Sequence, residues 1–258
     1  MEGAHETDPR PAREGQDRDA RVEAFFADAE NYFASGGAYS EPRSRLLRLM
    51  LGDCAGLDII DLGCGDGTLS LQFLPEARSV TLVDRSREML DAARRIADTQ
   101  WEQRVRYLQA DLSGFRTEEQ FDVVLCIGVL AHVPDVSEVL DLIAGLLRPG
   151  GRCAVQLTDR DRRLVPLHDR YAQIRRRFGS ADRRGYETNR MSVASIRAAA
   201  AQRGLRFSAV RHYGLLVPGL DRLPASVAKA VERASWKRPW VSRHAVEAII
   251  LFTAPGGR

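Results

Sequence analysis

One stretch, residues 59–68 (IIDLGCGDGT), constrains the fold of this chain more than any other. An apolar run enters three glycines at alternate positions, Gly63, Gly65 and Gly67, and a helix pattern follows. A glycine turn of this kind lets main-chain atoms approach a bound ligand closely, because no Cβ stands in the way. The stretch therefore predicts a strand, a ligand-binding turn and a helix.

Strand and helix patterns alternate regularly from this turn onward. Strands are expected at 57–62, 79–84, 105–110, 121–127, 153–157, 205–213 and 245–252, and helices at 68–74, 86–98, 137–147 and 192–203. The segment 121–127 (FDVVLCI) is continuously apolar, as in a strand covered on both faces. Residues 149–151 (PGG) are expected to turn the chain. Repeated strand–helix units predict an α/β, Rossmann-like, doubly wound parallel sheet.

The regions outside this alternation suggest the domain organisation. Residues 1–20 contain no Val, Leu, Ile or aromatic residue, so a disordered tail is expected. Residues 21–56 are expected to form a helical cap, whose second helix carries Leu46, Leu47, Leu49 and Met50 and ends near Gly52. The main domain is expected to span 57–258. Within it, the insert 158–191 holds ten arginines against five acidic residues, and we expect it to form a lid.

Composition restricts the cellular setting and the partners. No apolar run approaches the roughly 20 residues that span a bilayer, and the polar N-terminus has no signal-peptide core. The four cysteines form no C-x-x-C pair and are typical of a reduced compartment, so a cytoplasmic location is expected. The formal net charge of +3 is too small to indicate nucleic acid by itself. We expect neither a membrane nor a nucleic acid as partner, and the oligomeric state is open.

Acidic residues around the glycine turn indicate the ligand. The turn lacks the third glycine of G-x-G-x-x-G pyrophosphate binders, and Asp61 and Asp66 would repel a diphosphate but suit a cationic ligand. Asp84 ends the next strand, about 20 residues beyond Gly63, where a carboxylate can bind a ribose diol. Asp111 follows the third strand and could bind an adenine amine. Either carboxylate could instead cap the segment that follows it.

Five motifs in this order, DLGCGDG, LVDRS, ADL, FDVVLCIGVLAHVPD and LLRPGG, resemble the class I S-adenosylmethionine-dependent methyltransferases that act on small molecules. The resemblance covers residues 57–157. It implies a seven-stranded sheet with an antiparallel last strand, S-adenosylmethionine as cofactor, S-adenosylhomocysteine as product and a small-molecule acceptor as partner.

The resemblance also implies roles for individual residues. Cofactor contacts are implied for Asp61, Gly63, Cys64, Gly65, Asp84, Arg85, Asp111, Leu112, Cys126 and Ile127. In some relatives an arginine before the first strand binds the cofactor carboxylate, and Arg45 is the best-placed candidate. Alternatively, Arg45 is solvated on an exposed helix face, and the cysteines are packing residues of the core.

His132 follows the fourth strand and is the candidate general base, since a hydroxyl acceptor must lose its proton. It could equally cap or pack at the next helix. Candidates for the acceptor pocket lie in the variable parts of the chain: Tyr39, His168, Tyr186, His212 and Tyr213. Ala131, rather than a glutamate, precedes His132, so no metal site is expected.

The function predicted from these residues is methyl transfer to a small organic acceptor, most simply at oxygen, with nitrogen or carbon also open. An RNA acceptor is the first alternative, because the insert and residues 236–240 (WKRPW) are basic. A non-methylating protein that binds the same cofactor is the second. The segment 125–128 (LCIG) lacks the N/D-P-P-Y/F motif of enzymes that methylate exocyclic amines of nucleic acids.

Overall fold

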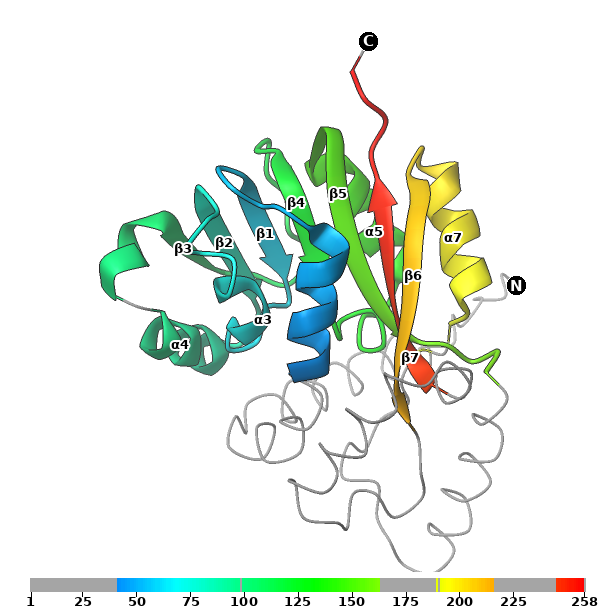
Figure 1. Ribbon diagram of the computed structural model, residues 1–258, viewed down its shortest axis with the longest axis horizontal. Coiled ribbons are helices and arrows are strands. Elements are labelled where there is room, and N and C mark those ends of the chain that lie inside the picture. The colour runs from blue at the N-terminus through cyan, green and yellow to red at the C-terminus, as the bar shows by residue number, and fades with distance from the viewer. Residues whose placement is uncertain (1–40, 98, 163–188, 190, 216–244, 258) are drawn as a thin grey trace, which may run out of the picture.

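The computed structural model describes residues 41–97, 99–162, 189, 191–215 and 245–257. Within these ranges one seven-stranded sheet has the order β3-β2-β1-β4-β5-β7-β6 (Figure 1). Its strands are β1 (Asp58–Leu62), β2 (Ser79–Asp84), β3 (Val105–Gln109), β4 (Phe121–Cys126), β5 (Leu147–Thr158), β6 (Arg206–Leu215) and β7 (Ala245–Thr253). The helices are 41–51, α3 (Thr68–Leu71), α4 (Arg87–Ile96), the 3-10 helix η1 (Thr99–Arg104), α5 (Val136–Leu146) and α7 (Val193–Gln202).

Strands β1 to β5 pair in parallel, whereas β7 runs antiparallel to both of its neighbours, β5 and β6. The predicted doubly wound sheet with an antiparallel last strand is therefore confirmed. Most predicted strands agree with the observed ones within one or two residues.

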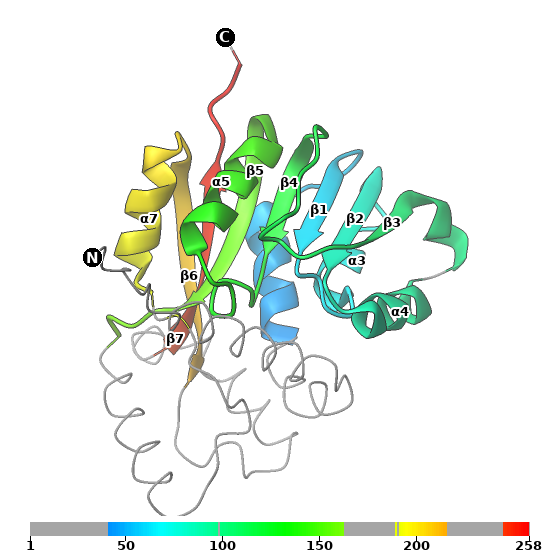
Figure 2. The same cartoon turned by 180° about the vertical axis from the view of Figure 1, so that it is seen from behind.

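Helices cover both faces of the sheet, so apolar residues are needed on both sides of the central strands. Helices α5 and α7 lie on one face (Figure 2), and helix 41–51, α3 and α4 lie on the other (Figure 1). In β4, Val124 and Cys126 pack on the α5 side, while Val123 and Leu125 pack on the opposite side. This double covering explains why the strand is continuously apolar.

Helix α3 is shorter than the predicted helix 68–74. After Leu71 the chain continues in turns, with Phe73 N donating to Ser70 O at 3.1 Å and Leu74 N to Leu71 O at 3.0 Å. Pro75 disfavours a helical conformation of the residue before it, which gives a physical reason for the early end.

Strand β5 begins six residues before the predicted strand 153–157, because the PGG segment does not leave the sheet. Phe121 pairs with Leu147 and Val123 with Arg152, so β5 bulges between these two pairs. Gly150 has φ +77°, a conformation that favours glycine, and its N–H donates to Pro255 O at 3.0 Å. The predicted turn is a bulge inside a longer strand.

Helix 41–51 ends where the sequence predicts, but one residue of its apolar face was assigned wrongly. Leu46 and Leu47 are buried, whereas Leu49 is 70% exposed and Leu51 takes its place in the core. Gly52 N donates to Arg48 O at 3.0 Å, with φ +68°, and closes the helix. The tail 1–20, the cap residues 21–40 and insert residues 163–188 and 190 lie outside the described residues, so these assignments stay predictions.

The strand order places a ligand site between β1 and β4. The chain moves outward from β1 to β2 and β3, then returns to β4 on the other side of β1. In open α/β sheets ligands bind at such a switch point, outside the carboxyl ends of the strands. The loops after β1, β2, β3 and β4 all begin at this edge.

An ionic cluster holds the opposite edge, at the start of β1 and β4. Arg148 Nη1 donates to Asp58 Oδ2 at 2.9 Å and to Asp122 Oδ2 at 2.6 Å. Asp122 Oδ2 also accepts the N–H of Asp58 at 2.9 Å, and Ser79 Oγ donates to Asp58 Oδ1 at 2.8 Å. Burial raises the pKa of Asp58, but the hydrogen bonds from Ser79 and Arg148 outweigh it and bring the pKa below its ordinary value.

Replacing Arg148 with methionine should lower the free energy of unfolding by about 1–3 kcal/mol, because two partly buried carboxylates lose a shared donor. The difference in free energy of unfolding between the variant and the wild type should shrink as the pH falls below 3.8, since protonation of Asp58 removes the charge that Arg148 stabilises. Urea denaturation at several pH values measures both effects. Arg106→Met is the matched control, because Arg106 pairs with Glu119 on the surface; a loss as large there would contradict the explanation.

Candidate active site

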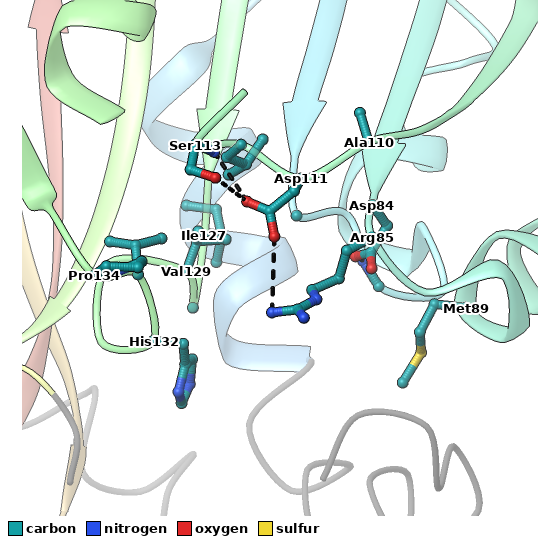
Figure 3. A pocket seen from close by; sticks show the side chains of 15 residues that line it. Asp84, Arg85, Met89, Ala110, Asp111, Ser113, Ile127, Val129, His132 and Pro134 are labelled. Atoms are coloured by element: carbon teal, nitrogen blue, oxygen red, sulfur yellow. Dashed lines mark hydrogen bonds and ion pairs between the residues drawn. The ribbon is translucent and has the colours of Figure 1, made fainter. Parts of the chain in front are cut away.

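A cavity lies at the carboxyl ends of β1 to β4, at the switch point of the sheet (Figure 3). Its lining combines the glycine turn, the ends of three further strands and the loop after β4. The lining residues are Gly63, Gly65, Asp84, Arg85, Met89, Ala110, Asp111, Leu112, Ser113, Ile127, Gly128, Val129, His132, Val133 and Pro134. The structure thus gathers eight of the predicted site residues around one space: Gly63, Gly65, Asp84, Arg85, Asp111, Leu112, Ile127 and His132.

The glycine turn is anchored to the end of β2 and open to the cavity. The N–H groups of Gly63 and Cys64 both donate to Val83 O, at 2.8 and 3.0 Å. Gly63 has φ +69°, and a Cβ there would lie 2.5 Å from Val129 Cγ2, so the position requires glycine. A Cβ at Gly65 would meet no atom within 4 Å, and its backbone faces free space.

Asp84 joins the turn to the next helix while its carboxylate lines the cavity. Its Oδ2 accepts the N–H of Gly65 at 2.8 Å, and its Oδ1 accepts the N–H of Ser86 at 2.9 Å. Burial raises the pKa of Asp84, and these two hydrogen bonds oppose the rise. A carboxylate offers about four acceptor positions. The capping and ligand-binding interpretations are therefore compatible, because the backbone hydrogen bonds do not use all of these positions.

Asp111 and Arg85 form the rim of the cavity after β3 and β2. Asp111 Oδ1 accepts the N–H and the hydroxyl of Ser113, at 2.9 and 2.8 Å. Arg85 Nη1 lies 3.8 Å from Asp111 Oδ2 (Figure 3). Burial raises the pKa of Asp111, but the bonds from Ser113 bring the net pKa below its ordinary value. Asp111 therefore caps its own turn and presents an ionised group to the cavity.

Asp61 lies beneath the turn and does not line the cavity. Its side chain is buried, with 3% of its surface exposed. Burial raises the pKa of Asp61 to about 6; the hydrogen bond with Ser70 opposes the rise, and the charges of Asp84 and Asp66 add to it. The turn thus concentrates carboxylates in a poorly solvated place, which favours a positively charged ligand.

The two predicted cofactor-contacting cysteines do not reach the cavity. Cys126 is fully buried in the core on the α5 side, and Cys64 packs on the opposite side. Burial raises the pKa of both thiols, so they remain protonated near neutral pH. For Cys126 the reason is strand alternation, because only the next residue, Ile127, faces the cavity.

The loop after β4 forms the wall that faces the glycine turn. Ile127, Val129, Val133 and Pro134 make this wall apolar, and His132 adds an imidazole to it (Figure 3). The N–H of His132 donates to Val129 O at 2.8 Å, so the loop turns tightly just before the histidine. Of the predicted catalytic and pocket residues, His132 is the one that the described structure places at the cavity.

The remaining predicted residues lie elsewhere or are not described. Arg45 is exposed on helix 41–51 and does not line the cavity. His212 Nε2 lies 3.2 Å from Asp159 Oδ2, and burial lowers the pKa of His212 against the opposing effect of that carboxylate. Tyr213 is buried, and its hydroxyl accepts Arg43 Nε at 2.9 Å. Three further candidates lie outside the described residues: Tyr39, His168 and Tyr186.

Sequence reasoning missed several lining residues. Ala110, Ser113, Gly128, Val129, Val133 and Pro134 adjoin predicted positions, and the rule that strand ends converge at one edge could have included them. Met89 could have been found from the predicted N-cap of the helix that follows Asp84. Its N–H donates to the side chain of the N-cap residue Ser86, so Met89 lies in the first turn of α4, shortly after Asp84 in the chain.

The described residues contain no group of three or more His, Cys, Asp or Glu side chains arranged to hold a metal ion. Among the same residues, no helix has the length and apolar character required to cross a membrane.

Known proteins similar to this chain are methyltransferases. Residues 60–153 match a family described as "Methyltransferase domain". A ubiquinone biosynthesis O-methyltransferase of Aeromonas salmonicida is 39% identical over 111 residues, which cover 43% of this chain and 47% of that protein. The chain spans about half the length of the curated relatives it matches.

Solved structures share the fold at low sequence identity. Magnesium protoporphyrin IX methyltransferase of Synechocystis PCC 6803 has a TM-score of 0.63 at 15% identity, covering 92% of this chain and 99% of that chain. A 1,6-didemethyltoxoflavin N1-methyltransferase of Burkholderia thailandensis has a TM-score of 0.61 at 18% identity, covering 98% and 93%. Residues 60–153 therefore resemble a methyltransferase domain, and the topology of the sheet is compatible with that match.

Proposed function

We propose that the protein transfers a methyl group from S-adenosylmethionine to an oxygen atom of a small organic acceptor. One observation carries the proposal: a single cavity has an acid-flanked glycine turn on one side and His132 on the facing wall. The first side suits a cationic nucleoside, and the second suits removal of a hydroxyl proton. An enzyme that methylates hydroxyl groups needs both.

The residues present fit S-adenosylmethionine. Asp84 has acceptor positions left for a ribose diol after binding Gly65 and Ser86. Leu112 and Ile127 provide apolar walls for an adenine ring, and Asp111 lies at its expected edge. The open backbone at Gly65 leaves room for the methionyl part near the carboxylates.

The chemistry requires alignment more than activation. S-adenosylmethionine supplies a methyl group already activated on a sulfonium. The protein must hold the acceptor oxygen in line behind that methyl, an effect worth up to about 7–11 kcal/mol in well-aligned systems. The apolar wall of Ile127, Val129 and Pro134 excludes water from this place. His132 would accept the hydroxyl proton as the oxygen attacks.

Several curated relatives named ubiquinone biosynthesis O-methyltransferase support oxygen as the acceptor atom. Their matches cover about half of each relative, so the acceptor itself remains a proposal. The RNA alternative depends on the basic insert and on residues 236–240, most of which lie outside the described residues. A binding protein without transfer activity would need no histidine at the acceptor wall.

Purified protein should form S-adenosylhomocysteine and a methylated product when given S-adenosylmethionine and a panel of phenols and catechols. Mass spectrometry identifies both products. His132→Gln should lower kcat on the best acceptor by about 10²–10⁴-fold, because a general base is lost, and should leave S-adenosylhomocysteine affinity unchanged. Methylation of short RNAs but of no phenol would overturn the proposed acceptor class. Full activity of the variant would remove His132 from the mechanism.

Asp84→Ala should abolish binding of S-adenosylhomocysteine, because the variant loses the diol acceptor and releases the N–H of Gly65. Titration calorimetry measures the affinity directly. Asp91→Ala is the matched control, since Asp91 pairs with Arg94 on the outer side of α4. Unchanged affinity in Asp84→Ala would refute the assignment of this cavity to the cofactor.

Asp61→Asn should stabilise the empty protein at pH 7 by about 1–3 kcal/mol, because a buried carboxylate no longer has to ionise. In wild type the folded pKa of about 6 lies above the ordinary 3.8. The folded state therefore binds the proton more tightly, and stability is lost as the pH rises through 6. The variant should lack this slope in urea denaturation and should bind S-adenosylmethionine more weakly. An unaltered slope would contradict the buried charge.

A further inference from the structure

The wall that carries His132 is held in place by a residue from a distant segment, Asn189. The side-chain Nδ2 of Asn189 donates to Leu130 O at 3.1 Å and to Val133 O at 2.6 Å. Its backbone N–H donates to Ala131 O at 2.8 Å. One residue therefore binds three carbonyl groups of a four-residue loop.

These three carbonyls enclose His132 on both sides along the chain. Leu130 and Ala131 precede the histidine, and Val133 follows it. The loop's own hydrogen bond, from His132 N to Val129 O, closes a turn but does not fix that turn against the rest of the domain. Leu130 adds one buried anchor. Asn189 adds three polar contacts to the loop.

The chemistry of asparagine matches this task. A neutral amide has two N–H donors on one nitrogen, and here they satisfy two carbonyls that face the same point. Aspartate has the same shape but no donor when ionised, so it would set a negative charge against two carbonyl oxygens. Replacing Asn189 with aspartate therefore tests whether its hydrogen bonds are needed, because the shape of the side chain is kept.

Asn189 also connects the cavity wall to the end of the insert 158–191. Two residues later, Met191 forms a bridge with Asp159, and Met191 O accepts the N–H of Arg160 at 2.9 Å. Ser192 then caps α7 by accepting the N–H of Ser195. The segment that closes the insert is therefore fixed at β5 on one side and at the His132 loop on the other.

We propose that Asn189 is a positioning residue: it fixes the loop 129–134 so that His132 faces the acceptor side of the cavity. The catalytic consequence rests on the proposed function, whereas the structural consequence does not. The geometry makes the end of the insert part of the acceptor wall without requiring it to touch a substrate.

The unmodified protein offers a first test. Asn31 and Asn189 are the two asparagines of the chain, so selective ¹⁵N-asparagine labelling gives two side-chain amide signals. Sequence-specific resonance assignment of the unmodified protein distinguishes them. The Asn189 amide protons should exchange slowly with solvent and show nuclear Overhauser effects to the α-protons of Leu130 or Val133. Fast exchange without these effects in wild type would overturn the proposal, whether or not any variant folds.

Asn189→Ala and Asn189→Asp provide the functional test, with Gln72→Ala as matched control because Gln72 Nε2 donates to Leu69 O at 2.7 Å away from the cavity. Both Asn189 variants should shift or broaden the imidazole signal of His132 in S-adenosylhomocysteine-bound protein. Their kcat/KM for the best phenol should fall on the order of 10–100-fold, since small displacements of a reacting group are costly. Cofactor affinity should stay within about twofold, because the hydrogen bonds described for Asn189 go to the loop after β4 and not to the glycine turn.

The outcomes distinguish this inference from the proposed function. A wild-type protein that does not bind S-adenosylhomocysteine defeats the proposed function and leaves the amide measurement standing. A wild-type enzyme that is active, with Asn189→Asp retaining both its rate and the His132 signal, defeats the positioning role. A shifted His132 signal with an unchanged rate also defeats it, because the loop then moves without consequence for the reaction.

Discussion

Negative charge held close to a backbone turn is the constraint on which the rest of this structure depends. Asp61, Asp66 and Asp84 surround the turn after β1, and burial together with their mutual repulsion raises the pKa of Asp61 to about 6. Backbone N–H groups partly compensate, since Gly65 and Ser86 both donate to Asp84. Such an arrangement is costly in an empty protein and favourable around a cation. The same carboxylates that lower the stability of the empty protein would therefore favour the binding of a cation.

The two sides of the cavity are built in different ways. The side proposed to bind the cofactor consists of residues at the ends of β1, β2 and β3, held by hydrogen bonds that continue the sheet, such as Ala110 N to Asp84 O. The acceptor side is a loop, and part of its support comes from Asn189, a residue far along the chain. Under the proposed function, a donor site built on the sheet would coexist with an acceptor wall that other segments support.

The sequence allowed much of the fold to be predicted, because hydrophobic periodicity and strand–helix alternation are local signals. Deviations occurred where distant contacts decide. Pro149 to Gly151 read as a turn, but pairing with β4 and the contact from Gly150 to Pro255 keep the segment inside β5. Leu49 was predicted to lie on the apolar face of its helix, but in the structure its side chain is exposed.

The same distinction explains the site. Gly63, Asp84, Asp111 and Ile127 could be predicted because parallel strands end at one edge. Cys126 lies away from the cavity because strand alternation points it into the core, one residue before Ile127, which lines the cavity. Asn189 could not be found at all, since no local pattern reveals which loop a returning segment will meet.

The absence of a side chain at residue 63 has a consequence for how the cavity of this protein could be redesigned. Val129 occupies the space that a Cβ at Gly63 would need, so the glycine turn and the loop after β4 are in close contact. An engineer who enlarges residue 129 to narrow the acceptor cavity would push on the turn as well. Changes of acceptor specificity are therefore better sought at Val133 or Pro134, which line the cavity without filling the space at Gly63.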